Sequence, residues 1–253
     1  PQLEGHPRPI KARISEGLFL IATGLAKKIV LADYVSVNLV DRVFDTPEGY
    51  TAAEVVVALY GFTLQMYADF SGYTDVARGS AKLFGIELPE NFDRPYQSTS
   101  PAEFWRRWHM TLSTWLRDYL YFPLGGSRHG EARTYFNLWL TIFLIGLWHG
   151  ASWTFVLYGA IQGTAVALHR YVSRTWGGHT SDTDAGPRRD PPWLFALKVF
   201  GTLQFVVFSR ILFRASDMEN AGAITSELLG GGWGLANVSP SVWEVLVLGF
   251  ALH

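Results

Sequence analysis

Two histidines in aromatic surroundings are the residues best suited to chemistry. His149 lies in segment 147–153 (LWHGASW), and His109 lies in segment 104–113 (FWRRWHMTLS). An imidazole titrates near neutral pH, and its neutral form can take a proton from an attacking hydroxyl group. The pattern therefore indicates a general-base site. The sequence leaves open the alternative that each imidazole is only a hydrogen-bonded core residue.

The element that must position His149 is a long run without charge. Residues 134–169 contain no Asp, Glu, Lys or Arg over 36 positions, and His149 lies near the middle. A bilayer span needs about 20 residues, so the run nearly makes two spans. Glycines in the run that suit close helix approach or a break are Gly146, Gly150, Gly159 and Gly163. We predict two helical pieces broken or sharply turned within 146–152, or one long tilted helix broken there, with Gly150 and Ala151 leaving room for a substrate.

A second helix is predicted around His109. Ser100 and Glu103 form a capping box with Pro101 at the first helical position, and the glycines at 125–126 predict the end. At about 100° per residue, the apolar arc of this helix contains Phe104, Trp105, Trp108, Leu112, Trp115, Leu116, Tyr119 and Leu120. His109 falls inside this arc. We therefore expect His109 to face the interior, with Arg106 and Arg117 on the polar side.

Four further segments have the composition of membrane helices: 18–39, 52–70, 193–213 and the short run 242–252. Basic residues make two of them poorer spans, Lys27 and Lys28 in 18–39 and Lys198 and Arg210 in 193–213. Such helices are tilted, lie at the interface or line a polar cavity. Without strand alternation or internal repeats, the chain is predicted to be all-α.

The composition agrees with a membrane protein. Only 17% of the 253 residues are charged, 15% are aromatic, and ten are Trp. This argues against a soluble domain, in which about 25% of residues are charged, and against disorder. The net charge of −1 gives no reason to expect nucleic acid, and the absence of Cys excludes thiolate chemistry. Because residue 1 is Pro and the run 242–252 stops after half a span, we expect a fragment incomplete at both ends.

Five motifs in this order carry a family resemblance: DFSGYTD (69–75), FDRPY (92–96), FWRRWHMTLS (104–113), WLRDYLYFPLGG (115–126) and GLWHGAS (146–152). The sequence resembles the membrane-bound O-acyltransferase (MBOAT) family, and within it the bacterial branch that includes the alginate O-acetylation membrane protein. The resemblance implies a polytopic transmembrane helical bundle with amphipathic and re-entrant helices around a central tunnel. Residues 1–253 would then be part of one membrane-embedded acyltransferase domain. Independently of the resemblance, the Gly-, Pro- and Asp-rich composition of residues 177–192 predicts an exposed loop.

The resemblance also implies the chemistry. Members transfer an acyl group from a thioester donor to a hydroxyl acceptor, and His149 and His109 match the catalytic and the second histidine of this branch. The implied setting is the bacterial inner membrane, with multiple passes through lipid. Acetyl-CoA is the expected co-substrate, no cofactor or metal is expected to be bound, and a periplasmic acetyltransferase is the expected protein partner.

Several alternatives stay open at this point. A transporter, or a non-catalytic scaffold subunit of a polysaccharide-modification complex, would also place histidines in broken membrane helices. Four arginines could hold a donor phosphate or instead contact lipid head groups: Arg94, Arg106, Arg107 and Arg117. Asp69 and Asp75, expected to flank a turn or a broken helix, could cap a helix or line the tunnel mouth. The sequence does not name the acceptor.

Overall fold

The computed structural model describes residues 11–175 and 190–253, and these are almost entirely helical. The predicted all-α class is confirmed for the described residues. Most of the expected loop 177–192 lies outside them. The helices are α1 (Lys11–Ala26), η1 (Lys27–Asp33), η2 (Ser36–Val40), α2 (Asp41–Asp45), η3 (Pro47–Gly49), α3 (Ala52–Leu83), η4 (Pro95–Gln97), α4 (Pro101–Arg107), α5 (Met110–Leu116), η5 (Arg117–Tyr121), α6 (Glu131–His149), α7 (Trp153–Thr175), α8 (Pro192–Arg214), α9 (Met218–Gly230) and α10 (Pro240–Leu252).

The described chain divides into two compact units. One contains the residues up to Asn91 together with Gly222–His253, and the other contains Phe92–Ala221. Both His109 and His149 belong to the second unit.

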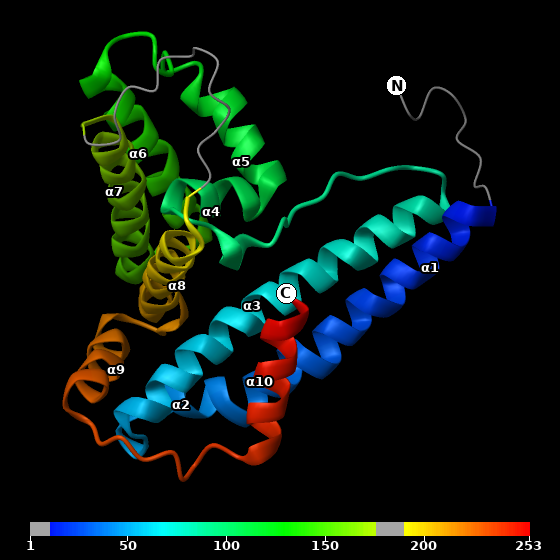
Figure 1. Cartoon of the computed structure of the whole chain (residues 1–253), viewed down its shortest axis with the longest axis vertical. Helices are drawn as coiled ribbons and strands as arrows, with labels where there is room; N and C mark the ends of the chain where they lie inside the picture. Colours follow the sequence, from blue (N-terminus) through cyan, green and yellow to red (C-terminus); the bar gives the residue numbers. More distant parts are fainter. Residues whose placement is uncertain (1–10, 176–189) are drawn as a thin grey trace. The chain divides into compact units, whose positions relative to one another are not determined.

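In the first unit, α1 and α3 lie side by side along their length (Figure 1). Glycines seven residues apart allow the two backbones to approach closely. An added Cβ on Gly17 would lie 2.8 Å from the carbonyl oxygen of Gly79, and one on Gly24 would lie 2.5 Å from that of Gly72. These contacts pair the start of α1 with the end of α3, so the two helices run antiparallel.

Two lysines at the start of η1, which directly follows α1, are paired with aspartates of α3. The Lys27 and Lys28 ammonium groups lie 2.6 Å from carboxylate oxygens of Asp75 and Asp69, respectively. The expected turn or broken helix between the two aspartates is wrong, because both belong to the continuous 32-residue α3. A capping box between Thr51 and Glu54 starts that helix.

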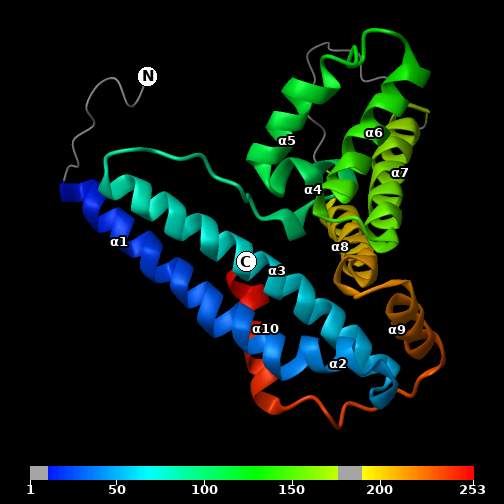
Figure 2. The same cartoon turned by 180° about the vertical axis from the view of Figure 1, so that it is seen from behind.

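In the second unit, α6 and α7 form an antiparallel hairpin that can be followed in both views (Figure 1, Figure 2). Helix α6 ends at His149 and α7 begins at Trp153, so the predicted break within 146–152 is confirmed. An added Cβ on Gly146 would lie 2.5 Å from the Cα of Gly159. The glycines of the charge-free run therefore bring the two helices together, as expected.

One described helix, α8, is long and apolar enough to cross a membrane, and α10 is a shorter apolar helix. This agrees with the membrane segment expected at 193–213. The polytopic bundle around a tunnel stays a prediction.

We predict that Gly146→Ala destabilises the full-length protein by about 1–3 kcal/mol, because the new methyl group would overlap the backbone of α7. The measurement is thermal unfolding of the detergent-solubilised protein. Gly201→Ala in α8 is the control, since an added Cβ there meets nothing within 4 Å. It should leave the stability unchanged or raise it by up to about 1 kcal/mol. Equal unfolding midpoints for the two variants would contradict the close contact.

Candidate functional site

His149 is the last residue of α6, and three aromatic rings surround its imidazole. Its ring centroid lies 4.8 Å from that of Phe213, 5.1 Å from that of Trp148 and 6.1 Å from that of Phe155. The residue is nevertheless exposed within the described chain. The imidazole thus lies at a helix end where a small molecule can reach it, and it is not enclosed in the middle of an apolar helix.

The space on one side of Gly150 is occupied. Gly150 has an extended backbone with φ of 167°, and an added Cβ would lie 2.8 Å from the ring of Phe155. Gly150 permits the phenyl ring that packs next to the imidazole. The approach of a substrate past Gly150 and Ala151 stays a prediction.

His109 lies in the link between α4 and α5, with its backbone in the left-handed region at φ 46°. The prediction of one helix from Ser100 to about Tyr121 is therefore wrong. The cause is a tertiary contact, because residues 92–96 pair with the end of α4. The Asp93 amide donates to the Arg107 carbonyl at 3.0 Å, and Phe92 forms an isolated antiparallel bridge with Trp108.

The start of α4 follows the sequence more closely. The Ser100 side chain accepts a hydrogen bond from the Glu103 amide, and Pro101 occupies the first helical position. The Glu103 carboxylate, however, accepts from the amide and hydroxyl of Thr99. Burial alone would raise the pKa of Glu103, but the Thr99 hydrogen bonds and the charge of Arg107 hold this pKa below its usual value.

The helical-wheel prediction is confirmed for the side chains that it set against each other. Trp105 and Leu116 are buried, His109 is half-buried, and Arg106 and Arg117 are exposed, as expected. It is wrong for two expected core residues beyond the break, because Trp115 and Tyr119 are 55% and 68% exposed. Neither α4 nor α5 is a candidate span, and burial lowers the pKa of His109 in the link between them, which favours the neutral imidazole.

A buried polar link connects three helices behind the histidines. The Trp105 indole donates to the Gln162 side-chain oxygen at 3.2 Å, and the Gln162 amide donates to the Ser209 hydroxyl at 2.9 Å. Ser209 in turn donates to the Val206 carbonyl. Gln162 is 1% exposed, so the link fixes α4, α7 and α8 relative to one another.

Arg210 is the residue that the sequence reasoning missed. It follows Ser209 on α8 and is 2% exposed. From the sequence alone, its charge indicates a helix that is tilted, lies at the interface or lines a polar cavity, and gives Arg210 no role of its own. The signal was present, since a charged residue inside an apolar helix is by default a functional candidate.

The structure brings the two histidines into the same neighbourhood. The guanidinium of Arg210 lies over the ring of Trp108, which precedes His109, and over the ring of Phe213, which contacts the imidazole of His149, although 40 positions separate the histidines in sequence. Their joint role in catalysis stays a prediction.

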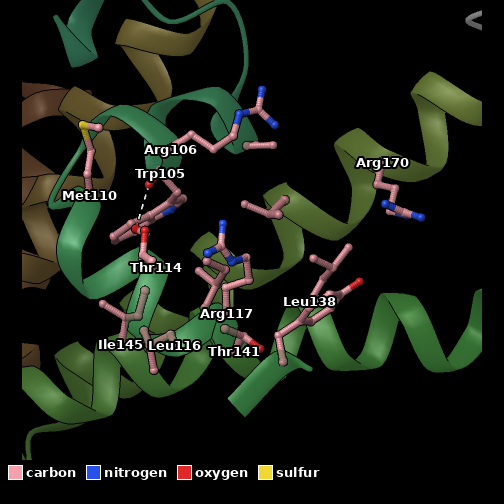
Figure 3. A pocket seen from close by; sticks show the side chains of 15 residues that line it. Trp105, Arg106, Met110, Thr114, Leu116, Arg117, Leu138, Thr141, Ile145 and Arg170 are labelled. Carbon is pink, nitrogen blue, oxygen red and sulfur yellow. Dashed lines mark hydrogen bonds between the residues drawn. The ribbon is translucent and has the colours of Figure 1, made fainter. Parts of the chain in front are cut away.

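A pocket of about 510 Å³ lies between α4, α5 and η5 on one side and α6 and α7 on the other. Figure 3 shows its apolar lining together with the guanidinium groups of Arg106, Arg117 and Arg170. Met110, adjacent to His109, and Trp105 also line it, whereas neither histidine does. Its apolar wall with basic groups suits an amphiphile that carries a phosphate.

Within residues 11–175 and 190–253, no cluster of three or more His, Asp or Glu side chains could hold a metal ion.

Comparison with known proteins decides the family. The profile of the membrane-bound O-acyltransferase family matches residues 10–200. The chain belongs to this family. It is therefore a membrane protein of an acyltransferase family.

Three curated relatives show the range of the family. The chain is 39% identical over 228 residues to the "Probable alginate O-acetylase AlgI" of Pseudomonas fluorescens, covering 90% of this chain and 43% of that protein. It is 36% identical to the "Peptidoglycan O-acetyltransferase" of Helicobacter pylori, with 92% and 42% covered, and 28% identical to the "Teichoic acid D-alanyltransferase" of Bacillus subtilis, with 64% and 41% covered. The chain thus spans less than half the length of these relatives.

We predict that His109→Gly is more stable than His109→Ala by about 1 kcal/mol. Both variants lose the imidazole, but only glycine adopts the left-handed backbone without steric cost. Thermal unfolding of the two full-length variants in detergent measures this difference. An alanine variant as stable as the glycine variant would show that the backbone at this position is not left-handed.

Proposed function

We propose that the full-length protein transfers an acetyl group from a thioester donor to a hydroxyl group of an exported polysaccharide. The observation that carries this proposal is the accessible imidazole of His149, with His109 nearby, in a chain of the O-acyltransferase family. Relatives named for alginate and peptidoglycan acetylation support acetyl as the group and a glycan such as alginate as the acceptor.

In the proposed reaction, the imidazole of His149 takes the proton of the acceptor hydroxyl. The hydroxyl oxygen forms a bond to the acyl carbon, and the negative charge develops on the former carbonyl oxygen. When the carbon–sulfur bond breaks, the proton held by His149 passes to the departing thiolate. His109 assists as a second group on the same proton path. No metal or bound cofactor is needed for these steps.

We place the donor in the pocket beside Met110, with acetyl-CoA as the expected donor. Its arginines would hold the phosphate groups of the donor, and the apolar wall would contact its pantetheine arm. The protein would reside in the bacterial inner membrane with several passes. A periplasmic acetyltransferase is the proposed protein partner in the acetylation of the polysaccharide.

We predict that His149→Ala in the full-length protein lowers acetyl transfer by about 10²- to 10⁴-fold, because a positioned base is lost. The protein should still accumulate in the membrane, since the exposed ring contributes little to the core. His109→Gly should also impair transfer, and the double variant should lose less than the product of the two single losses if both act on one proton path. Glycan acetylation is measured by mass analysis of the exported polymer.

Unchanged glycan acetylation in a His149→Ala strain would remove the enzyme assignment. It would favour the alternative functions, a transporter or a non-catalytic scaffold subunit. Multiplicative losses in the double variant would show that the two histidines act separately.

We predict that the double substitution Arg106→Gln and Arg117→Gln raises the KM for the donor about tenfold or more, because phosphate contacts of charged groups contribute about 1.5–3 kcal/mol each. Arg128→Gln is the matched control, since Arg128 is an exposed arginine nearby that does not line the pocket. An unchanged donor KM in the double variant would indicate that these arginines contact lipid head groups only.

A further inference from the structure

A buried cation lies behind the two histidines. Arg210 is 2% exposed on α8, the one described helix that could cross a membrane by length and composition. Removing a guanidinium from water costs several kcal/mol unless the surroundings compensate it. The groups around Arg210 must therefore compensate the cost of burying its charge.

Two aromatic rings hold the guanidinium. Its central carbon lies 4.9 Å from the Trp108 ring centroid and 5.9 Å from that of Phe213, both within the range of cation–π attraction. Each ring belongs to the surroundings of one histidine. Trp108 directly precedes His109, and the ring of Phe213 meets the imidazole of His149 edge to face at 4.8 Å.

The position of Arg210 is itself fixed. The preceding residue, Ser209, belongs to the buried link through Gln162 to Trp105. The turn of α8 that contains Arg210 is therefore held against α4 and α7. Movement of the guanidinium would displace the Trp108 ring or the Phe213 ring. Its charge also acts on His149 and on the buried Tyr158, whose ring lies 5.1 Å from that of Phe213.

We propose that Arg210 is a positioning residue for acyl transfer. By attracting the rings of Trp108 and Phe213, it sets the 108–109 link and the aromatic wall beside His149, and so it fixes the two imidazoles relative to each other. It acts through these rings and does not contact the substrate. This inference rests on the proposed function of His149.

The test uses the full-length protein with acetyl-CoA and a glycan acceptor in detergent or vesicles. Arg210→Met removes the charge and keeps a similar length, and it should lower kcat about 10²-fold because misplacement by about 1 Å costs this much. The donor KM should change little, since Arg210 does not line the pocket. Arg210→Lys, which keeps a cation, should retain more kcat than Arg210→Met.

Two further variants complete the design. Lys198→Met removes a cation from the exposed face of the same helix, where Lys198 pairs with Asp190, and it should leave kcat unchanged. Phe213→Leu removes the ring between Arg210 and His149, and it should reproduce the loss of kcat. If Arg210→Met does not accumulate, the kcat values of Arg210→Lys and Phe213→Leu test the proposal in its place.

Wild-type kcat in both Arg210→Lys and Phe213→Leu would overturn the proposal, as would a loss confined to the donor KM. Comparing kcat of the Arg210 variants with kcat of His149→Ala separates the two proposals. If His149→Ala alone leaves transfer intact, the proposed function fails. If His149→Ala abolishes transfer while the Arg210 variants retain full kcat, only the role of Arg210 fails.

Discussion

The candidate site depends on the two hydrogen bonds made by the side-chain amide of Gln162. This amide accepts from the Trp105 indole and donates to the Ser209 hydroxyl, and it is almost fully buried. A buried amide that loses a partner leaves an unsatisfied group that costs about 1–3 kcal/mol, so the three helices are held in one arrangement. Trp105 fixes the helix before His109, and Ser209 fixes the turn that contains Arg210. The side chain of Gln162 therefore helps to position the aromatic rings around both imidazoles.

Glycine supplies the complementary constraint. The contact of Gly146 with Gly159 allows α6 and α7 to meet through their backbones. This close approach places the end of α6, and with it His149, against rings from α7 and α8. The polar link sets which helices meet, and the glycines set how closely two of them pack. His149 can thus remain exposed while its ring is supported on several sides.

The sequence predicted those parts of the fold that depend on local pattern. The length of the charge-free run and its glycines predicted the break between α6 and α7, and Ser100 with Pro101 predicted the start of α4. The break at His109 could not be predicted in this way. Residues 92–96 pair with the end of α4 through Phe92 and Asp93, and a helical wheel contains no information about a segment outside the helix.

The same limit applies to the candidate site. The histidines were recognisable from their motifs, because the motifs are contiguous. Arg210 becomes informative only when Trp108 and Phe213 are seen on its two sides, and these come from positions about a hundred residues apart. Likewise, the ion pairs of Asp69 and Asp75 could not be predicted, because their lysine partners lie far away in sequence.

The paired charges of η1 and α3 bear on the order in which this unit can form during synthesis. Lys27 and Lys28 leave the ribosome well before Asp69 and Asp75, so the two ammonium groups are made before their counter-charges. The close backbone contacts of Gly17 and Gly24 likewise need residues of α3. Neither the ion pairs nor the glycine contacts can therefore form until most of α3 has been translated, and packing of the two helices is a late event for the segment that is made first.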